Sequence, residues 1–241
     1  MVYLPGGTFR MGSEKGHGDE KPVHEVTLDA FAVGRYPVTV GEYLRFARET
    51  GKNYPEWLEE GSEYHLDTGE KDHYRRVGVS PEKGQLPVVG VSWEDARSYC
   101  EWLSEQTGEH YGLLTEAEWE FACRAGSESD YCFGDDRKLL DQFAWYSENS
   151  GSTLHDVGLK KANDWGIHDM HGLVREWVQD RFGDYPSERQ RNPSGPESGR
   201  LRVLRGGSWC NSADDCRSAD RSHDGPGLRH HYLGFRLSRT V

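Results

Sequence analysis

Three segments of the chain combine a helix-starting signal, an amphipathic pattern and a glycine stop. Each begins with Ser or Thr followed three positions later by Glu or Asp, so the two side chains satisfy each other's free backbone amides. Apolar residues then recur at the spacing that places them on one face of a helix. The glycine that follows favours the left-handed conformation in which helices end. We therefore predict helices between Thr39 and Gly51, between Ser92 and Gly108, and between Thr115 and Gly126.

The rest of the chain consists of short strand-like runs separated by turn-rich stretches. Residues 53–87 and 127–165 are rich in Gly, Asp and Tyr and have few periodic runs. No composition break, long repeat or low-complexity tail divides the sequence. We therefore expect one α+β domain over residues 1–241, with short antiparallel strands and about three helices. The predicted strands lie at 8–11, 26–28, 202–205 and 234–237.

Composition and charge narrow the classes of partner. Only 34% of the residues are hydrophobic, whereas Gly (29) and Trp (8) are abundant, as in a domain with much irregular backbone and large buried aromatics. The net charge of −12 disfavours nucleic acid and anionic lipid. No apolar run is long enough for a membrane span and the N-terminus lacks a signal-peptide pattern, so membrane insertion is not expected and the location is left open. The five cysteines form no regular framework and are expected to be reduced thiols.

Residues 210–233 differ in composition from the rest of the chain. They contain no Lys, Glu, Gln, Met or Trp, although these types supply 47 of the other 217 residues, so about five would be expected in 24. The segment is small, polar and rich in His and Gly, and it lies between RGGSW at 205–209 and GFR at 234–236. This deficit indicates a segment whose residues follow a different rule from those of the surrounding scaffold.

Several phrases of the sequence resemble the formylglycine-generating enzyme (sulfatase-modifying factor) family, whose fold is C-type lectin-like. The resemblance follows the family's order along essentially the whole chain and implies that fold. It leaves the activity open, because the family includes oxidases, sulfoxide synthases and proteins that only bind ligands. The matching stretches are PGGTFRMGS at 5–13, PVT at 37–39, PVVGVSW at 87–93, LTEAEWEFA at 114–122, NDWGIHDM at 163–170, GLVREW at 172–177, RGGSW at 205–209 and GFR at 234–236.

The end of the chain is similar to the variable proteins of diversity-generating retroelements, which display a hypervariable ligand-binding surface on this fold. The shared pattern is RGGSW…N…CRSA.R…P…GFR. In that system variable codons usually begin as AAC and change in their first two bases, so Lys, Glu, Gln, Met and Trp cannot arise. The resemblance therefore accounts for the missing residue types. It implies a protein or glycan ligand and requires no cofactor.

The same resemblance divides residues 210–232 into framework and display positions, with Trp209 anchoring the surface from below. The alternative is an ordinary Gly-, Asp- and Ser-rich surface loop. The expected framework residues are Asn211, Cys216, Arg217, Ser218, Ala219, Arg221 and Pro226. The expected display residues, whose polar and aromatic types suit recognition, are Cys210, Ser212, Ala213, Asp214, Asp215, Asp220, Ser222, His223, Asp224, Gly225, Gly227, Leu228, Arg229, His230, His231 and Tyr232.

A copper-dependent oxidase is the alternative function that the resemblance implies. Formylglycine-generating enzymes bind copper through two cysteines near the C-terminus and oxidise a sulfatase cysteine, and thiolates suit Cu(I) because both are soft. The only catalytic candidates here are Cys210 and Cys216, separated by five residues instead of the family's four. An iron-dependent sulfoxide synthase is disfavoured, because the adjacent His230 and His231 would point to opposite faces of a strand. Ligand binding without catalysis is therefore the favoured interpretation.

A structural calcium ion is also suggested by the resemblance. Family members hold calcium on backbone carbonyls and a carboxylate in the stretch that matches 172–177, which points to Gly172, Val174 and Glu176. The family's phrase NVWEW is altered here to LVREW, and Arg175 would disfavour a cation if its side chain turned inward. Alternatively, Glu176 is a buried ion-pair partner of an arginine, such as Arg205 or Arg236.

Overall fold

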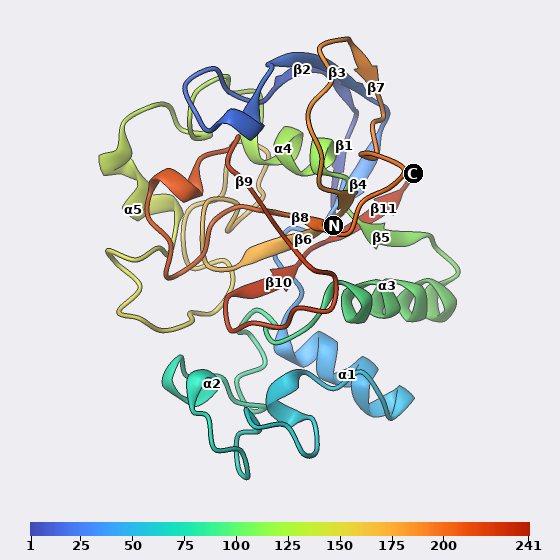
Figure 1. The fold of residues 1–241 in the computed structure, drawn as a ribbon, viewed down its shortest axis with the longest axis vertical. Coiled ribbons are helices and arrows are strands. Elements are labelled where there is room, and N and C mark those ends of the chain that lie inside the picture. Colours follow the sequence, from blue (N-terminus) through green and yellow to red (C-terminus); the bar gives the residue numbers. More distant parts are fainter.

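The computed structural model describes residues 1–241 and contains the three predicted helices (Figure 1). In each, the Ser or Thr hydroxyl accepts a hydrogen bond from the backbone amide three residues later, and the acidic side chain at that position accepts one from the first residue's amide. The first two helices end at left-handed glycines as predicted, whereas the third ends at Ala125, with φ 47°. The helices are α1 (Val40–Thr50), α3 (Trp93–Thr107) and α4 (Glu116–Arg124).

Single-turn helices lie in the stretches where the sequence shows little periodicity. α2 (His73–Arg76) lies within 53–87, and α5 (Leu140–Phe143) lies within 127–165. A helix of one turn has too few residues to produce a periodic pattern, and packing against the rest of the protein stabilises it. Short 3-10 turns add to the irregular backbone, at Gly18–Glu20, Glu56–Leu58, Arg137–Leu139 and Asp214–Cys216.

Eleven short strands form three sheets, and their combination with the helices is the expected α+β architecture. Most pairs are antiparallel, whereas β10–β6 and β3–β7 are parallel. The first sheet has the order β1 (Val2–Leu4), β4 (Phe31–Val33), β11 (Leu237–Thr240) and β5 (Tyr111–Leu113). The second has the order β10 (Leu233–Phe235), β6 (Arg175–Arg181), β8 (Arg202–Arg205) and β9 (Arg221–Asp224). The third has the order β2 (Gly7–Met11), β3 (His24–Leu28) and β7 (Gln190–Arg191).

The single strand predicted at 234–237 is divided between two sheets. β10 ends at Phe235, and β11 begins at Leu237 in a different sheet. Arg236 lies between them and is buried, and its guanidinium pairs with the buried carboxylate of Glu176 at 2.8 Å. A buried charge requires a partner, so this ion pair holds Arg236 in the interior at the point where the chain crosses between the sheets.

Tryptophans carry much of the core. Trp57, Trp119 and Trp177 are fully buried in three different hydrophobic clusters. Each indole N–H donates a hydrogen bond to a carbonyl or carboxylate oxygen, at 2.8–3.2 Å. The chain has few apolar residues, so each must bury a large area. Large aromatic side chains whose polar atoms are hydrogen-bonded meet this need.

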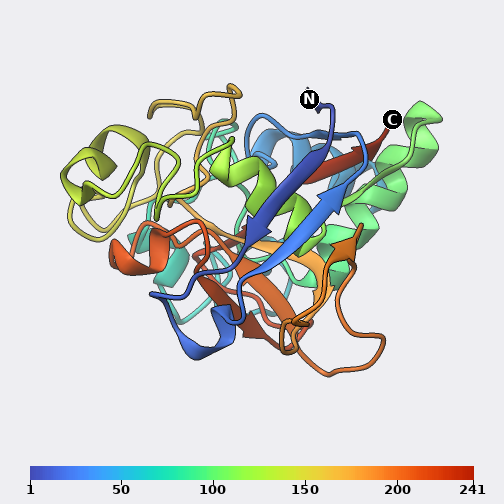
Figure 2. The same cartoon turned by 90° about the horizontal axis from the view of Figure 1, so that it is seen from above.

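The helices lie on different sides of the second sheet. α4 lies beside β2 and β3, whereas α1 and α3 lie on the opposite side, with residues 53–87 forming the lower part of the molecule (Figure 1). β4 lies between β1 and β11, so the two ends of the chain are close together in both ribbon views (Figure 2). None of the helices combines the length and the apolar character that crossing a membrane requires.

Candidate ligand-binding surface

Residues 210–232 form two largely exposed or half-buried stretches separated by a buried one. The first stretch, 210–215, leads through a 3-10 turn to buried residues 216–221. The second stretch, 222–232, includes the end of β9 and the loop that leads into β10. Both stretches lack regular structure over most of their length and run as loops beside the second sheet (Figure 1).

The first exposed stretch is held by its own polar side chains. Cys210, Ser212 and Asp214 are exposed, and Asp214 pairs with Arg137 at 3.1 Å. The half-buried carboxylate of Asp215 accepts hydrogen bonds from the backbone amide of Ser212 at 2.9 Å and from its hydroxyl at 2.6 Å. Local turn contacts therefore shape this stretch and leave three side chains open to solvent.

Buried arginines fix the backbone between the two exposed stretches. Arg217 pairs with both carboxylate oxygens of Glu20, at 2.7 and 2.9 Å. Arg221 pairs in the same way with Glu116, at 2.6 and 2.8 Å. Arg205, in the neighbouring strand β8, donates to the backbone carbonyl of Ser218 at 3.0 Å. Two-point pairs of this kind restrain both position and direction, so residues 216–221 form a rigid base.

Burial follows the predicted framework closely. Cys216, Arg217, Ser218, Ala219 and Arg221 are buried, whereas Asn211 and Pro226 are half-buried. Trp209, the predicted anchor, is also buried, and its indole N–H donates to the carbonyl of His231 at 3.2 Å. The side chain of Trp209 therefore ties the start of the segment to its end.

Two of the predicted display residues do not reach the surface. Ala213 and Asp220 are both 2% exposed. Ala213 packs in a small hydrophobic cluster, and Asp220 lies 3.1 Å from the guanidinium of the buried Arg175. Burial raises the pKa of the Asp220 carboxyl to about 6, although Arg175 lowers it. These positions belong to the base, and the remaining fourteen predicted display residues are exposed or half-buried.

The second exposed stretch is held mainly through its backbone. The carbonyls of Pro226 and His230 accept hydrogen bonds from the amides of Trp93 and Gly90, at 2.9 and 3.0 Å. Among its side chains, Arg229 pairs with Asp95 at 2.9 Å. Backbone anchoring does not depend on the side chains of Pro226 and His230, so these contacts tolerate different residues there.

Three aromatic side chains gather at the end of the second stretch. The ring centroid of His230 lies 4.2 Å from that of His231 and 4.0 Å from that of Tyr232. The expectation that the two histidines point to opposite faces was wrong, because they lie in a turn before β10 instead of on a strand. Burial and the neighbouring imidazoles lower the pKa of His231 to about 4, and burial also lowers the pKa of His230.

A hollow of about 390 Å³ lies next to these rings. One side of it is the loop from Gly227 to His231, and the other side comes from 53–87, where sequence analysis predicted no functional residue. No signal in the sequence marks these residues, because they meet the display segment only in the folded chain. The other lining residues are Glu56, Tyr64, His73 and Tyr74.

The two candidate copper ligands lie in different environments. Cys210 is exposed, and its Sγ lies 3.3 Å from the Ser208 hydroxyl. Cys216 is fully buried in the hydrophobic cluster that contains Ala213, and a Cβ on Gly207 would lie 2.6 Å from its Sγ. Burial raises the pKa of both thiols, most strongly that of Cys216, which disfavours the thiolate form. The geometry gives Cys216 a packing role.

The predicted calcium ligands do not fit a calcium ion. Both carboxylate oxygens of Glu176 lie within hydrogen-bond distance of Arg236, and one of them also accepts the indole N–H of Trp119 at 2.8 Å. The carbonyl of Gly172 accepts the amide of Val174 at 2.9 Å. An arginine already neutralises the carboxylate, so little attraction for a dication remains. The alternative prediction, a buried ion pair between Glu176 and an arginine, agrees with this geometry.

Another group of possible metal ligands is likewise occupied by an arginine. Single ligand atoms of His17, Glu20 and Asp220 lie within 4.8 Å of one another. Arg217 binds both oxygens of Glu20 and lies 3.9 Å from Asp220. The guanidinium supplies the positive charge that these carboxylates require, so the group is explained as part of the buried base.

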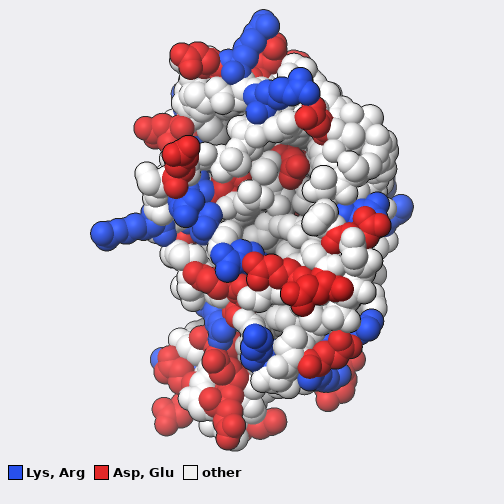
Figure 3. Space-filling view, turned by 90° about the vertical axis from the view of Figure 1, so that its right-hand side faces the viewer, with Lys and Arg blue, Asp and Glu red and all other residues white.

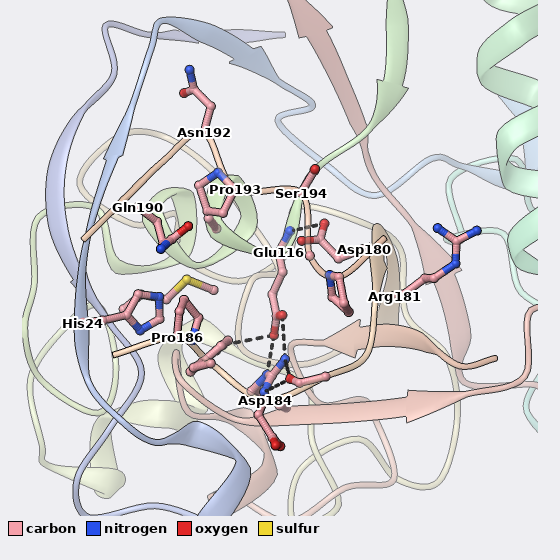
Figure 4. A pocket seen from close by; sticks show the side chains of 17 residues that line it. His24, Glu116, Asp180, Arg181, Asp184, Pro186, Gln190, Asn192, Pro193 and Ser194 are labelled. Atoms are coloured by element: carbon pink, nitrogen blue, oxygen red, sulfur yellow. Dashed lines mark hydrogen bonds and ion pairs between the residues drawn. The ribbon is translucent and has the colours of Figure 1, made fainter. Parts of the chain in front are cut away.

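A cavity larger than the hollow next to the aromatic rings lies away from the display residues. It has a volume of about 420 Å³ and is enclosed by residues 180–196, β3 and the start of α4 (Figure 4). Arg221, a framework residue, is its only lining residue from 210–232. The carboxylate of Glu116 forms an ion pair with Arg221, and the carboxylate of Asp180 accepts a hydrogen bond from the backbone amide of Glu116 at 2.8 Å. The buried charges of this cavity therefore hold the start of α4 in place.

The fold and the surface together define a C-type lectin-like domain that presents irregular loops on a base of buried ion pairs. The whole chain, residues 1–241, matches the sulfatase-modifying factor enzyme 1-like domain, and the chain belongs to this family.

Three known proteins are similar to this chain. The chain is 33% identical, over its full length, to the serine/threonine-protein kinase pkn1 of Chlamydia caviae, but it spans only 38% of that protein's length. It is 31% identical to the formylglycine-generating enzyme of Streptomyces coelicolor, covering 100% of this chain and 89% of the enzyme. Among solved structures, Treponema denticola variable protein 1 superimposes with a TM-score of 0.83 at 28% identity, covering 100% of this chain and 95% of that chain.

Proposed function

We propose that this domain is a ligand-binding protein whose recognition surface consists of the exposed and half-buried residues of 210–215 and 222–232. The observation that carries the proposal is the likeness to Treponema denticola variable protein 1 over the full length of the chain. In this proposal the surface is diversified by a retroelement, the ligand is a protein or a glycan, and no bond is made or broken. Neither calcium nor another cofactor is required.

The distribution of burial supports this function. A surface that changes its side chains must keep its backbone in place without them. Residues 216–221 meet this need through buried ion pairs, and the loop at 225–232 meets it through backbone hydrogen bonds to Gly90 and Trp93. In 210–215, by contrast, the contact between Ser212 and Asp215 is made by display side chains. Substituting exposed side chains on such a base changes specificity at little cost in stability.

The composition of 210–233 supports diversification. Lys, Glu, Gln, Met and Trp are absent from both exposed stretches and from the buried residues between them. Charge as such is not excluded, because 216–221 contain Arg217, Asp220 and Arg221, and burial does not explain the absence of Lys and Glu from the more exposed stretches, where these types are common. A restricted codon set accounts for both.

Sequencing the gene with its flanking DNA tests this function. We expect a near-copy of codons 203–236 beside a reverse transcriptase gene, with AAC at many of the fourteen exposed or half-buried display positions. The codons for Ala213 and Asp220 are expected to match the template, because these side chains are buried. The absence of a template, together with mixed third bases at the display codons, would contradict the proposal.

A copper-dependent oxidase is the second candidate, favoured by the likeness to the formylglycine-generating enzyme of Streptomyces coelicolor. It requires Cys210 and Cys216 to bind Cu(I) together. Titration with Cu(I) under anaerobic conditions, compared with Cys210→Ser and Cys216→Ser, tests it. Tight binding of one equivalent that both variants lose, with folding retained, would favour the oxidase over the binding protein.

A further inference from the structure

Beside the loop from Gly227 to His231, four aromatic side chains are arranged in a circle, each next to two of the others. Proceeding from Tyr64 to His73, His231 and Tyr74 and back to Tyr64, adjacent ring centroids are 5.4, 5.7, 6.4 and 6.1 Å apart. Tyr74 is nearly perpendicular to both of its neighbours, with interplanar angles of 87°, and the two imidazoles are nearly parallel at 11°. All four rings line the hollow of about 390 Å³, and we call this arrangement the aromatic cage.

One carboxylate of the hollow has an oxygen available to a ligand. Glu56 is half-buried, and its Oε2 accepts the hydroxyl of Tyr74 at 2.6 Å. Its Oε1 accepts no hydrogen bond and forms no ion pair within the protein. The hydroxyl of Tyr74 therefore fixes the carboxylate at the edge of the aromatic cage and leaves one oxygen free.

The charges around the aromatic cage leave Glu56 without a cation of its own. Arg229 lines the hollow, but it pairs with Asp95 at 2.9 Å and with Glu59. Glu63 has Lys71 at 4.0 Å. The lower part of the molecule, which contains residues 53–87, carries many Asp and Glu side chains (Figure 3). The field at the hollow therefore favours a positively charged group.

The imidazole of His231 adds no positive charge to the aromatic cage at neutral pH. Burial, followed by the nearby His230 and His73, lowers the pKa of His231 to about 4. His230 is half-buried and its pKa is lowered in the same way. A neutral imidazole offers its ring face to a cation, whereas a protonated one repels it.

From this geometry we propose that the aromatic cage binds a primary alkylammonium group, such as a lysine side chain of a protein partner. The rings supply cation–π attraction, and the free oxygen of Glu56 accepts an N–H of the ammonium. The hydrogen bond selects a primary ammonium over a quaternary one, which has no N–H to donate. This inference rests on the proposed function, because His230 and His231 belong to the display segment, and it assigns a ligand chemistry to that surface.

The probe for this site is Nα-acetyl-lysine methylamide, titrated at millimolar concentration and pH 7 while the ring protons of His73 and His231 are followed by NMR. We expect saturable shifts of both rings. Nα,Nε-diacetyl-lysine methylamide, which keeps the chain but lacks the charge, and tetramethylammonium, which keeps the charge but lacks the N–H, are expected to bind at least tenfold more weakly. Equal binding of either control would overturn the proposal, as would the absence of saturable shifts.

Matched variants assign the contact to named residues. Glu56→Gln retains an acceptor for Tyr74 and is expected to weaken probe binding about tenfold, as loss of a charged hydrogen-bond partner does. Glu60→Gln removes the same charge from an exposed neighbour outside the hollow and is expected to leave binding within twofold. His73→Leu replaces an exposed wall of the aromatic cage and is expected to weaken binding several-fold. Equal effects of the two glutamate variants would indicate non-specific attraction and contradict the proposal.

The titration with the ammonium probe and the search for a retroelement template give independent answers. A retroelement template found beside the gene, with no response to the ammonium probe, would refute only the ammonium site. A clear response to the probe without a template would refute diversification and leave a fixed ammonium-binding site.

Discussion

At the scale of single residues, the surface depends on arginines that lie beneath it. Arg217 and Arg221 are anchored to Glu20 and Glu116, and neither guanidinium is available to a ligand. Removing one partner from a buried pair leaves an uncompensated charge in the interior, which costs far more than losing an exposed pair. The base of the surface is therefore sensitive to substitution, whereas the residues on it are not.

Replacing Arg221 tests this difference. We expect Arg221→Ala to lower the free energy of unfolding by about 3–5 kcal/mol, because Glu116 loses its two-point partner. Arg45→Ala removes an exposed pair with Glu49 and is expected to cost less than about 0.5 kcal/mol. Urea denaturation followed by circular dichroism measures both. Similar losses in the two variants would show that the buried pair carries no special weight.

The lowered pKa of His231 predicts that the free energy of unfolding decreases in acid. Its pKa is about 4 in the folded protein and near 6.5 in the unfolded chain, so the unfolded chain binds the additional proton as the pH falls. The contribution of the neutral imidazole is therefore fully present above about pH 6.5 and is lost between that pH and 4. Stability is expected to decrease more steeply over this range in the wild type than in His231→Gln.

Comparing the wild type with His231→Gln separates the effect of His231 from that of the other titrating groups, because both proteins contain those groups. Asp220, whose pKa is raised to about 6, acts in the opposite direction and is present in both proteins. Urea denaturation at pH 7, 6 and 5 gives the two slopes. Equal slopes would mean that His231 protonates freely in the folded protein.

At the scale of elements, the helices begin where a local hydrogen-bond motif allows them to begin. In α4 the hydroxyl of Thr115 accepts the amide of Glu118 at 3.1 Å, and the Glu118 carboxylate accepts the amide of Thr115 at 2.9 Å. All members of this motif lie within four residues. The sequence therefore predicts such a helix start without knowledge of the fold.

Removal of one capping hydroxyl is expected to cost about 1 kcal/mol. Thr115→Ala leaves the amide of Glu118 without its acceptor and shortens the stable part of α4. Thr68→Ala, at an exposed loop position, is the matched control and is expected to change the free energy of unfolding by less than about 0.5 kcal/mol. Denaturation curves of the two variants distinguish a capping effect from a general effect of losing threonine.

At the scale of the whole molecule, stability and recognition are assigned to different residues. A combined variant, Asp214→Ala, His223→Ala and His230→Ala, is expected to lower Tm by less than about 3 °C, because none of these side chains is fully buried. Arg217→Ala, from the base, is expected to lower it by at least about 6 °C. Thermal unfolding followed by circular dichroism compares them. Unfolding of the triple variant at ordinary temperature would contradict a display function.

The sequence by itself determined the parts of this protein whose signals are local. The three capped helices, the family phrases and the composition of 210–233 are all readable from neighbouring residues, because capping, periodicity and codon usage act over short stretches of chain. These signals predict the fold and identify the segment that carries the candidate surface.

Only the tertiary structure decided which residues of that segment reach solvent and what lies beside them. Ala213 and Asp220 were predicted at the surface and are buried, because exposure depends on packing against distant residues such as Arg175. His73 and Tyr74 stand next to His231 although they lie far apart from it in sequence. Contacts of this kind arise from the summed packing of the whole chain, and no short stretch of sequence encodes them.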